Sequence, residues 1–213
     1  MSAINNTSIV SMYGEFELPV MEQFYTLQGE GFFHGQAAYF IRLAGCDVGC
    51  VWCDVKESWE AEKHPVKSIF EIIAAVKLTP ARLCVVTGGE PLLYNLDSLT
   101  KALHEAGLKT NIETSASSTF SGDWDWVCIS PKKFKQPLPE NMPLADELKI
   151  IVFNKSDFEW AEKHANMVGP ECKLYLQPEW DKAKEISPLI IDYIKAHPQW
   201  QLSLQSHKYL DIP

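Results

Sequence analysis

The fold is decided by the segment Cys46-Asp47-Val48-Gly49-Cys50-Val51-Trp52-Cys53, which carries three cysteines within eight residues. Free cysteines are usually scattered singly through protein cores, so three on one short loop indicate a shared ligand. Three thiolates can hold three corners of an iron–sulfur cube or three positions on zinc. The nearest candidates for a fourth ligand are His34 and His64. A site with only three protein ligands leaves one metal position open, which is a reactive arrangement.

Length and composition predict one substantial domain. The chain has 213 residues, of which 46% are hydrophobic and 22% charged, as in ordinary globular proteins. We expect an N-terminal extension over residues 1–19 and a single domain over residues 20–213. No apolar run reaches the roughly 18 residues of a membrane-spanning helix, so no membrane partner is expected. The net charge of -9 argues against a nucleic-acid partner, because binding to a duplex needs a basic face.

The remaining cysteines and the start of the chain predict a cytoplasmic protein. Residues 1–11 lack the basic start and apolar stretch of a secretory signal. Thiols stay reduced in the cytoplasm, so disulfides are not expected. Cys84, Cys128 and Cys172 fall in apolar, strand-like segments and are interpreted as core residues rather than ligands.

Apolar runs and helical periodicities alternate along the chain, which indicates parallel βα units. Strands are predicted at residues 20–27, 36–43, 83–87, 109–113, 126–129, 147–153, 173–177 and 201–205, and helices at 66–77, 96–106, 156–167 and 181–196. Gly107 is expected to end the second helix and Ser156 to cap the third. About six parallel strands with few helices predict an incomplete TIM-type barrel, in which the carboxyl ends of the strands carry the chemistry.

Two polar features lie before the cysteine loop. Gln28-Gly29-Glu30-Gly31 opens a loop with three glycines in seven residues, which is either an ordinary turn or a close approach of backbone to a ligand. Arg42 lies near the end of the strand at 36–43. It is either a solvated edge residue or a clamp for a carboxylate, and the bidentate geometry of arginine suits the clamp.

Two motifs together resemble the radical S-adenosylmethionine (SAM) superfamily. The spacing Cys-x3-Cys-x2-Cys with the aromatic Trp52 before the last cysteine is typical of its cluster loop, and Gly88-Gly89-Glu90-Pro91 is similar to its second motif. The resemblance implies that Cys46, Cys50 and Cys53 ligate a 4Fe-4S cluster whose open iron is chelated by SAM. One electron from the cluster cleaves SAM to a 5′-deoxyadenosyl radical, and the Gly-Gly-Glu-Pro turn receives the methionine amine.

Further stretches resemble one family within it, the 7-carboxy-7-deazaguanine synthases. The most diagnostic are Gln28-Gly29-Glu30-Gly31 and the closing His207-Lys208-Tyr209, and the resemblance runs from about residue 20 to the end. It implies a carbon–nitrogen lyase that converts 6-carboxy-5,6,7,8-tetrahydropterin to 7-carboxy-7-deazaguanine with loss of ammonia, for queuosine and related 7-deazapurines. It also implies a shortened barrel, a homodimer and a one-electron reductant such as flavodoxin or ferredoxin.

The resemblance carries site residues over motif by motif, with no catalytic side chain beyond the radical chemistry of the cofactors. The SAM set comprises Trp52, Cys53, Asp54, Gly89, Glu113, Ser130, Pro131, Lys132 and Gln177. The substrate set comprises Leu27, Gln28, Gly29, Arg42, Thr87, His207 and Pro213. For Glu113, Gln177 and His207 the alternative is that they only support the site. In the family the C-terminal residue reaches the substrate, and a free carboxylate at Pro213 would suit the N–H donors of a pterin.

One position departs from the family pattern. The family commonly has a threonine directly after the Cys-Asp pair of the cluster loop, and its hydroxyl is a ligand of Mg²⁺. This chain has Val55 there, and valine has no side-chain oxygen. Two outcomes are open: water fills the vacant position and a weakened magnesium requirement remains, or the site is metal-free and Arg42 with neighbouring donors neutralises the carboxylate. We expect the weakened requirement.

Two other functions share part of this pattern. A radical SAM activase, which makes a glycyl radical on a partner protein, has the same cysteine and Gly-Gly-Glu motifs, but it does not explain Gln28 to Gly31 or the ending at His207. A zinc-stabilised interaction module would use the three cysteines without any reaction. Assay with the carboxylated pterin separates the first alternative, and iron and sulfide analysis separates the second.

Overall fold

Nine strands form one sheet in the order β3-β1-β2-β4-β5-β6-β7-β8-β9 within residues 16–213, the part of the chain that the computed structural model describes. The strands are β1 (Glu17–Leu27), β2 (Ala37–Leu43), β3 (Val66–Ser68), β4 (Leu83–Gly88), β5 (Lys109–Thr114), β6 (Trp126–Ile129), β7 (Glu147–Val152), β8 (Lys173–Pro178) and β9 (Trp200–Leu202). β1 pairs antiparallel with β2 and β3, and all strands from β2 to β9 other than β3 pair in parallel.

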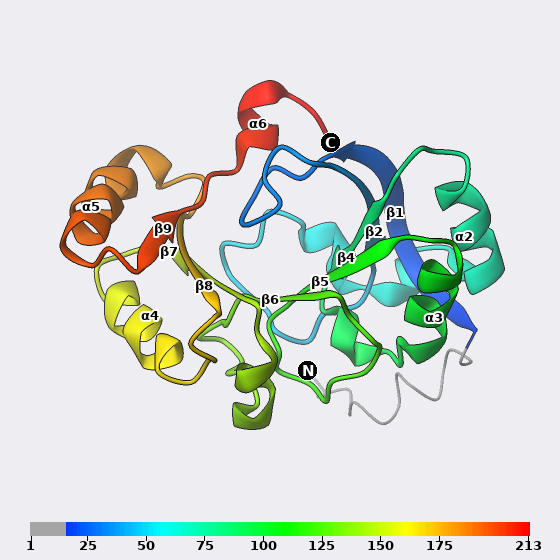
Figure 1. The fold of residues 1–213 in the computed structure, drawn as a ribbon, viewed down its shortest axis with the longest axis horizontal. Helices are drawn as coiled ribbons and strands as arrows, with labels where there is room; N and C mark the ends of the chain where they lie inside the picture. Colours follow the sequence, from blue (N-terminus) through cyan, green and yellow to red (C-terminus); the bar gives the residue numbers. More distant parts are fainter. Residues whose placement is uncertain (1–15) are drawn as a thin grey trace.

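The sheet curves into a partial ring whose two edge strands, β3 and β9, do not pair with each other (Figure 1). This arrangement confirms the predicted incomplete barrel and adds an antiparallel edge to it. The helices α2 (Ile69–Val76), α3 (Asp97–Glu105), α4 (Asp157–Ala165) and α5 (Ala183–Ala196) lie outside the curve, and α6 (Ser206–Leu210) lies near the C-terminus. No helix within residues 16–213 is long and apolar enough to cross a membrane.

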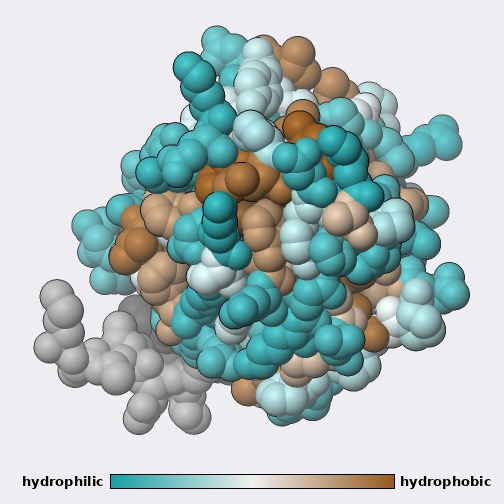
Figure 2. Space-filling model, turned by 90° about the vertical axis from the view of Figure 1, so that its left-hand side faces the viewer, coloured by the Kyte–Doolittle hydropathy of each residue, from teal (hydrophilic) through white to brown (hydrophobic). Residues whose placement is uncertain are grey.

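The pleat of the strands separates an apolar outer face from a more polar inner face, because successive side chains point to opposite sides. On β2, Tyr39, Ile41 and Leu43 belong to the main core between sheet and helices, whereas Phe40 belongs to a small inner cluster. The helices turn their polar sides outward. On the face that carries α4 and α5, hydrophilic side chains cover most of the surface, with hydrophobic ones gathered near its upper middle (Figure 2).

Several predicted boundaries differ from the structure. β1 begins at Glu17, so residues 17–19 of the predicted extension belong to the sheet, and residues 1–15 of it lie outside the described residues. Residues 66–68 of the first predicted helix form β3, because they pair with β1. The helix proper begins at Ile69 behind a capping box, in which the Glu71 backbone N donates to Ser68 Oγ and the Ser68 backbone N donates to the Glu71 carboxylate.

Of the two predicted helix boundaries, the one at Gly107 is confirmed and the cap at Ser156 is wrong. Gly107 follows α3 with a φ of +82°, which confirms its role in ending that helix. Ser156 precedes α4 but makes no capping bond; its hydroxyl donates to Asn154 Oδ1 at 2.7 Å. Asp157 Oδ2 accepts instead from the backbone N of Phe153 and Asn154, at 2.7 and 2.8 Å. The predicted strand at 201–205 is short, and residues 206–210 form α6.

Candidate active site

A cavity of about 430 Å³ lies at the carboxyl ends of the parallel strands. All three cysteines of the motif and Val55 line it. So do both predicted sets, with one exception: Pro131 does not line the cavity, although its neighbours Ser130 and Lys132 do. The structure therefore brings together residues that are spread over nearly the whole sequence, as expected for the catalytic end of a barrel.

The cluster loop is shaped by glycines and by a buried tyrosine. Gly45 has a φ of +98° and Gly49 a φ of +71°, conformations that glycine adopts without strain. A Cβ at Gly45 would overlap the hydroxyl of Tyr94, which donates to the Ala44 carbonyl at 2.7 Å. These constraints turn the chain directly after β2, so that the loop returns over the cavity.

All six cysteines are free thiols. Cys50 is buried, and Cys46 and Cys53 are half-buried. Burial raises the pKa of the Cys46 thiol and raises that of Cys50 to about 11, although the charge of Lys132 opposes the second shift. Because iron binds the thiolate, loading this loop with metal must release protons.

The donor set fits an iron–sulfur cube better than a single metal ion. Within residues 16–213 no group of three or more His, Cys, Asp or Glu side chains is placed to hold one ion. A zinc site needs its ligands to converge at about 2.0–2.3 Å on one metal, whereas a cube spreads its thiolates over different irons. His34 and His64 are bound elsewhere, to Ser206 Oγ at 2.8 Å and to the Glu57 carbonyl at 2.7 Å. The three thiols and the open cavity beside them thus fit a cube with one open iron.

The Gly-Gly-Glu-Pro turn is packed directly on the start of the cluster loop. The backbone N of Gly89 donates to the Leu43 carbonyl at 3.0 Å, and that of Glu90 to the Gly45 carbonyl at 2.8 Å. A Cβ at Gly88 would overlap the Leu43 backbone, and one at Gly89 would overlap the Gly45 carbonyl. Both glycines are therefore required for two loops to meet at the cavity.

The carboxylate of Glu90 is held by the end of β5. It is 1% exposed and accepts from Leu92 N at 3.0 Å, Thr114 Oγ1 at 2.5 Å, Ser115 N at 2.9 Å and Ser115 Oγ. The sequence predicts that this turn receives the methionine amine of SAM. In the structure the Glu90 side chain fixes the turn against β5, and Gly89 presents its backbone to the cavity.

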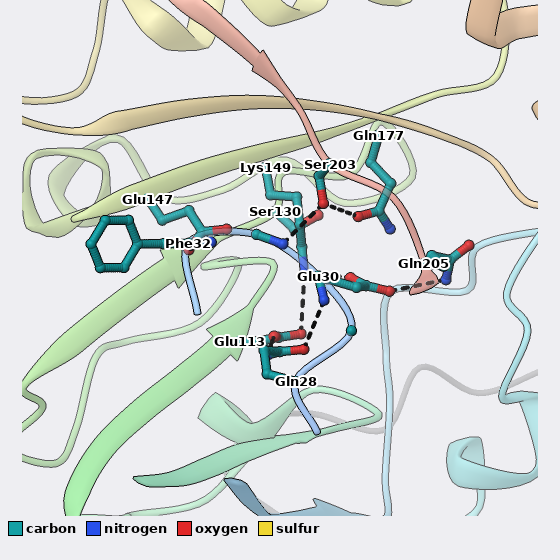
Figure 3. A network of polar contacts seen from close by, with 12 residues as sticks. Gln28, Glu30, Phe32, Glu113, Ser130, Glu147, Lys149, Gln177, Ser203 and Gln205 are labelled. Carbon is teal, nitrogen blue, oxygen red and sulfur yellow. Dashed lines mark hydrogen bonds and ion pairs between the residues drawn. The ribbon is translucent and has the colours of Figure 1, made fainter. Parts of the chain in front are cut away.

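The opposite wall carries a network of charged groups around Lys149 of β7 (Figure 3). Its Nζ lies 2.6 Å from Glu30 Oε2 and 3.4 Å from Glu113 Oε2. Gln28 Nε2 donates to Glu113 Oε1 at 2.8 Å, and Gln205 Nε2 donates to Glu30 Oε1 at 3.0 Å. Burial alone would raise the pKa of Glu30, but the charge and hydrogen bond of Lys149, with smaller contributions from His207 and Gln177, together lower the pKa to about 2.

The same network fixes the loop between β1 and β2. Gly31 N donates to Ser203 Oγ at 3.0 Å, and Ser203 Oγ donates to Gln177 Oε1 at 2.7 Å. Phe32 N donates to Glu147 Oε2 at 3.3 Å. Burial raises the pKa of Glu147, the first residue of β7. The glycine-rich segment is therefore held against the cavity by β7, β8 and the chain after β9.

Arg42 and Lys132 place two more cations on the cavity. Arg42 Nε donates to Glu22 Oε1 at 2.7 Å across β1 and β2, so its terminal nitrogens are the atoms that can meet a carboxylate. Lys132 Nζ donates to the Ser130 carbonyl at 2.7 Å and lies 5.8 Å from the ring centre of Trp52. Burial lowers the pKa of Lys132. Arg42 thus lines the cavity while its Nε is paired with Glu22, and its role as a clamp for a carboxylate stays a prediction.

α6 covers the cavity beside the cluster loop. Lys208 Nζ lies 2.6 Å from Asp54 Oδ2, and the His207 ring packs so closely on Gly29 that a Cβ there would overlap it. Burial lowers the pKa of His207. Glycine at position 29 is therefore needed for close approach of the final helix, and the approach of this loop to a ligand stays a prediction.

Residue 55 does not fit a magnesium ligand. Val55 lines the cavity without a side-chain oxygen, and its carbonyl accepts from Ser58 Oγ at 2.7 Å and from Ser58 N at 3.1 Å. Magnesium prefers oxygen ligands in octahedral geometry. The position that carries a threonine in the resembling family is thus occupied here by an apolar side chain and an engaged carbonyl.

Comparison with known proteins identifies the family. The profile of the Radical SAM superfamily matches residues 40–130. The chain is 51% identical to the 7-carboxy-7-deazaguanine synthase of Flavobacterium psychrophilum, over 92% of this chain and 93% of that protein. It is 33% identical to that of Escherichia coli K12, over 92% of this chain and 99% of that protein. The chain belongs to the 7-carboxy-7-deazaguanine synthase family.

Solved structures agree with this family. The crystal structure of QueE from Escherichia coli matches with a TM-score of 0.80 at 30% identity, over 95% of this chain and 99% of that one. Streptococcus suis SuiB, solved with its precursor peptide SuiA, matches with a TM-score of 0.55 at 12% identity, which is a likeness of fold alone. As a 7-carboxy-7-deazaguanine synthase of the radical SAM superfamily, the protein uses a 4Fe-4S cluster and SAM.

Prediction from sequence misses several residues of this site, among them Glu30, Lys149, Gln205 and Lys208, which all line the cavity. Lys149 and Lys208 bind the predicted site residues Glu113 and Asp54, and Gln205 binds Glu30. A lysine in the middle of an apolar strand is the one local signal that could have singled out Lys149, because lysine is almost never fully buried unless it is paired.

Proposed function

We propose that the protein is a 7-carboxy-7-deazaguanine synthase that converts 6-carboxy-5,6,7,8-tetrahydropterin to 7-carboxy-7-deazaguanine with loss of ammonia, in the synthesis of queuosine and related 7-deazapurines. One observation carries the proposal. A single cavity unites the three free thiols of the cluster loop and the Gly89 turn with the Gln28-Gly29 loop and Arg42. Neither a zinc module nor an activase accounts for the Gln28-Gly29 loop and Arg42 in this cavity.

The cofactors supply the radical chemistry, and the protein supplies position and shelter. When bound, the cluster and SAM together provide the radical that removes a hydrogen atom from the substrate. We assign Cys46, Cys50 and Cys53 to the cluster and the backbone at Gly89 to the methionine end of SAM. Holding the reacting carbon within contact distance of the radical source is worth several kcal/mol of barrier, on the order of 7–11 for ideal alignment.

The substrate is held between the two ends of the chain. We assign the terminal nitrogens of Arg42 to the substrate carboxylate, because an arginine fork matches a carboxylate in two bonds. Gln28, Gly29, Thr87, His207 and Pro213 surround the remaining space and are assigned to the ring system. α6 packs on Gly29 at the edge of this space. We assign α6 the role of limiting the access of bulk water, because a radical must be protected from other hydrogen donors.

Magnesium has a reduced role in this proposal. Since Val55 offers no oxygen, we assign the substrate carboxylate to Arg42 and expect magnesium to stimulate turnover only weakly, through water or other oxygen ligands. No step of the proposed reaction depends on a metal at residue 55.

The proposal includes a reductant, an oligomeric state and a compartment. A one-electron donor such as flavodoxin or ferredoxin is needed to reduce the cluster, and the family resemblance favours a homodimer. Six free cysteines and an oxygen-sensitive cluster favour the reducing cytoplasm.

The test is anaerobic reconstitution with iron and sulfide, followed by incubation with dithionite, SAM and 6-carboxytetrahydropterin. Mass spectrometry should show 7-carboxy-7-deazaguanine, and ammonia should be released in equal amount. Zinc without sulfide in the purified protein, or cleavage of SAM with no conversion of the pterin, would overturn the proposal. The second outcome would favour another radical SAM substrate.

A further inference from the structure

Lys149 is the cation that joins the two sets of ligand-binding residues (Figure 3). It contacts Glu30, which directly follows the substrate residues Gln28 and Gly29, and it contacts Glu113 of the SAM set. Its side chain is only 4% exposed. A charge held inside the protein depends on its partners far more than one at the surface does. One buried ammonium group therefore touches a carboxylate from each side of the cavity.

Gln28 forms a second link between the same two sets. Its Nε2 donates to Glu113 Oε1 at 2.8 Å, and its Oε1 accepts from Glu30 N at 3.1 Å. The two oxygens of Glu113 are thus bound by Gln28 and Lys149, and those of Glu30 by Lys149 and Gln205. A ligand that fixes Glu113 also fixes Lys149 and Gln28, and through them the loop at Glu30.

We propose that Lys149 is a positioning residue that couples the two sites, so that SAM and the pterin each bind more tightly when the other is present. The inference rests on the proposed function, which gives Glu113 to SAM and the loop at Gln28 to the substrate. Its cause is a shared contact: the first ligand restrains the side chains that join the two sites, so the second ligand has less freedom left to remove. Such coupling is reciprocal, so each ligand tightens the other by the same factor.

The charge of Lys149 also keeps its partners ionised. Burial would raise the pKa of Glu30, and the ammonium of Lys149 is the main group that lowers it, with smaller help from His207 and Gln177. Glu30 is therefore a carboxylate across the working pH range. Burial is the largest single influence on this pKa and Lys149 is its main counterweight, so without Lys149 the pKa of Glu30 rises. The titratable groups around Lys149 and Glu30 are Glu113, Cys128, Lys132, Glu147 and His207.

The test measures the dissociation constant of SAM on the reconstituted holoprotein, with and without 6-carboxytetrahydropterin. The cluster is kept oxidised, so that no turnover occurs. The variants are Lys149→Met, which keeps a long side chain without its charge, and the control Lys195→Met, which loses an exposed partner of Asp192 on α5. We expect the pterin to lower the dissociation constant of SAM by about 5- to 150-fold in the wild type and in the control. In Lys149→Met we expect the pterin to leave that dissociation constant unchanged.

Three results would overturn the coupling or the function separately. Tightening that persists in Lys149→Met overturns the role of Lys149. A wild type that converts the pterin but shows no mutual tightening overturns the coupling and leaves the proposed function intact. A wild type that binds SAM but neither binds nor converts the pterin overturns the proposed function itself.

A pH series separates positioning from a purely structural role. The ratio of the pterin dissociation constants, Lys149→Met over wild type, should rise as the pH falls from about 8 to about 5, because Glu30 takes up a proton only in the variant. A ratio that is constant with pH overturns the charge-holding role. If Lys149→Met does not fold, the double variant Lys149→Met with Glu30→Gln removes the buried charge that has lost its closest partner. Coupling at the wild-type factor in that double variant also overturns the proposal.

Discussion

The two halves of the sheet carry opposite chemistry on their inner faces. Each half reaches the cavity, through Phe24 and Phe40 on one side and through Glu113, Lys149 and Gln177 on the other. On the inner face of β2 and β4 lies a small apolar cluster, and Phe24 of β1 stacks on its member Phe40 with ring centres 5.4 Å apart. On the inner face from β5 to β8 lie charged and polar groups that hold one another. The apolar cluster comprises Ala38, Phe40, Leu83 and Val85, and the polar wall comprises Glu113, Glu147, Lys149 and Gln177.

The difference shows how one fold divides the work of binding. An apolar wall holds a ring through contact area, which has no preferred direction. A wall of fixed hydrogen-bonding groups adds direction, because donors and acceptors must align. Since both walls follow the same pleat, the division is set by which residue types occupy the inward positions of each strand. The cluster loop spans the mouth between the two walls.

The largest effect is expected from removing a ligand of the cluster. Replacing Cys46, Cys50 or Cys53 by Ala should abolish cleavage of SAM, because the cube loses one of its three protein thiolates. Cys84 and Cys128 serve as matched controls on the outer and inner faces, and their Ser variants should keep the cluster. Iron analysis and SAM cleavage measure both effects. Loss of iron in Cys128→Ser alone would show that the ligand set is wrong.

The apolar wall is broken by Phe40→Ala. This change empties the centre of the small cluster and should lower the free energy of unfolding by about 3–5 kcal/mol. Denaturant unfolding measures it. Phe70→Ala is the control, because Phe70 is 81% exposed on α2 and should cost far less. Equal losses in the two variants would show that the inner cluster adds nothing to stability.

Arg42 lies on β2 near the apolar cluster and lines the cavity, and its variants separate binding from stability. A charge-assisted pair is worth about 1.5–3 kcal/mol, so Arg42→Ala should lower turnover of the pterin roughly 10- to 150-fold. Arg42→Lys keeps the charge but loses the fork, and should recover part of the loss. Cleavage of SAM without pterin should persist in both variants. If turnover and uncoupled cleavage fell together, Arg42 would be a folding residue paired with Glu22.

The smallest effect is expected at Val55, which follows the cluster cysteines and lines the cavity. Val55→Thr adds a hydroxyl of nearly the same shape and should lower the magnesium concentration for half-maximal rate by a few-fold. A magnesium titration of both proteins under anaerobic turnover measures this. A wild type that already saturates at the same low concentration would contradict a role for this side chain in metal affinity.

The sequence predicts the positions that local patterns control and misses those that depend on distant partners. The strand ends and the glycines of the cavity follow from apolar runs and turn residues, and the barrel confirms them. Residues 66–68 have helical periodicity, yet they pair with β1, and no local pattern reports such pairing. Lys149 shows the same limit, because its partners Glu30 and Glu113 are 119 and 36 positions away.

Contacts between the two ends of the chain have a consequence for the order of assembly. Ser206 Oγ donates to the Gly29 carbonyl at 3.1 Å, and these residues are 177 positions apart. During synthesis the loop at Gly29 leaves the ribosome long before its partner exists. The central strands can pair meanwhile, since their contacts span shorter loops and need less chain entropy to close. The substrate side of the cavity is thus the last part to form. In a nascent chain the cluster loop can therefore fold before the contacts that enclose the pterin exist.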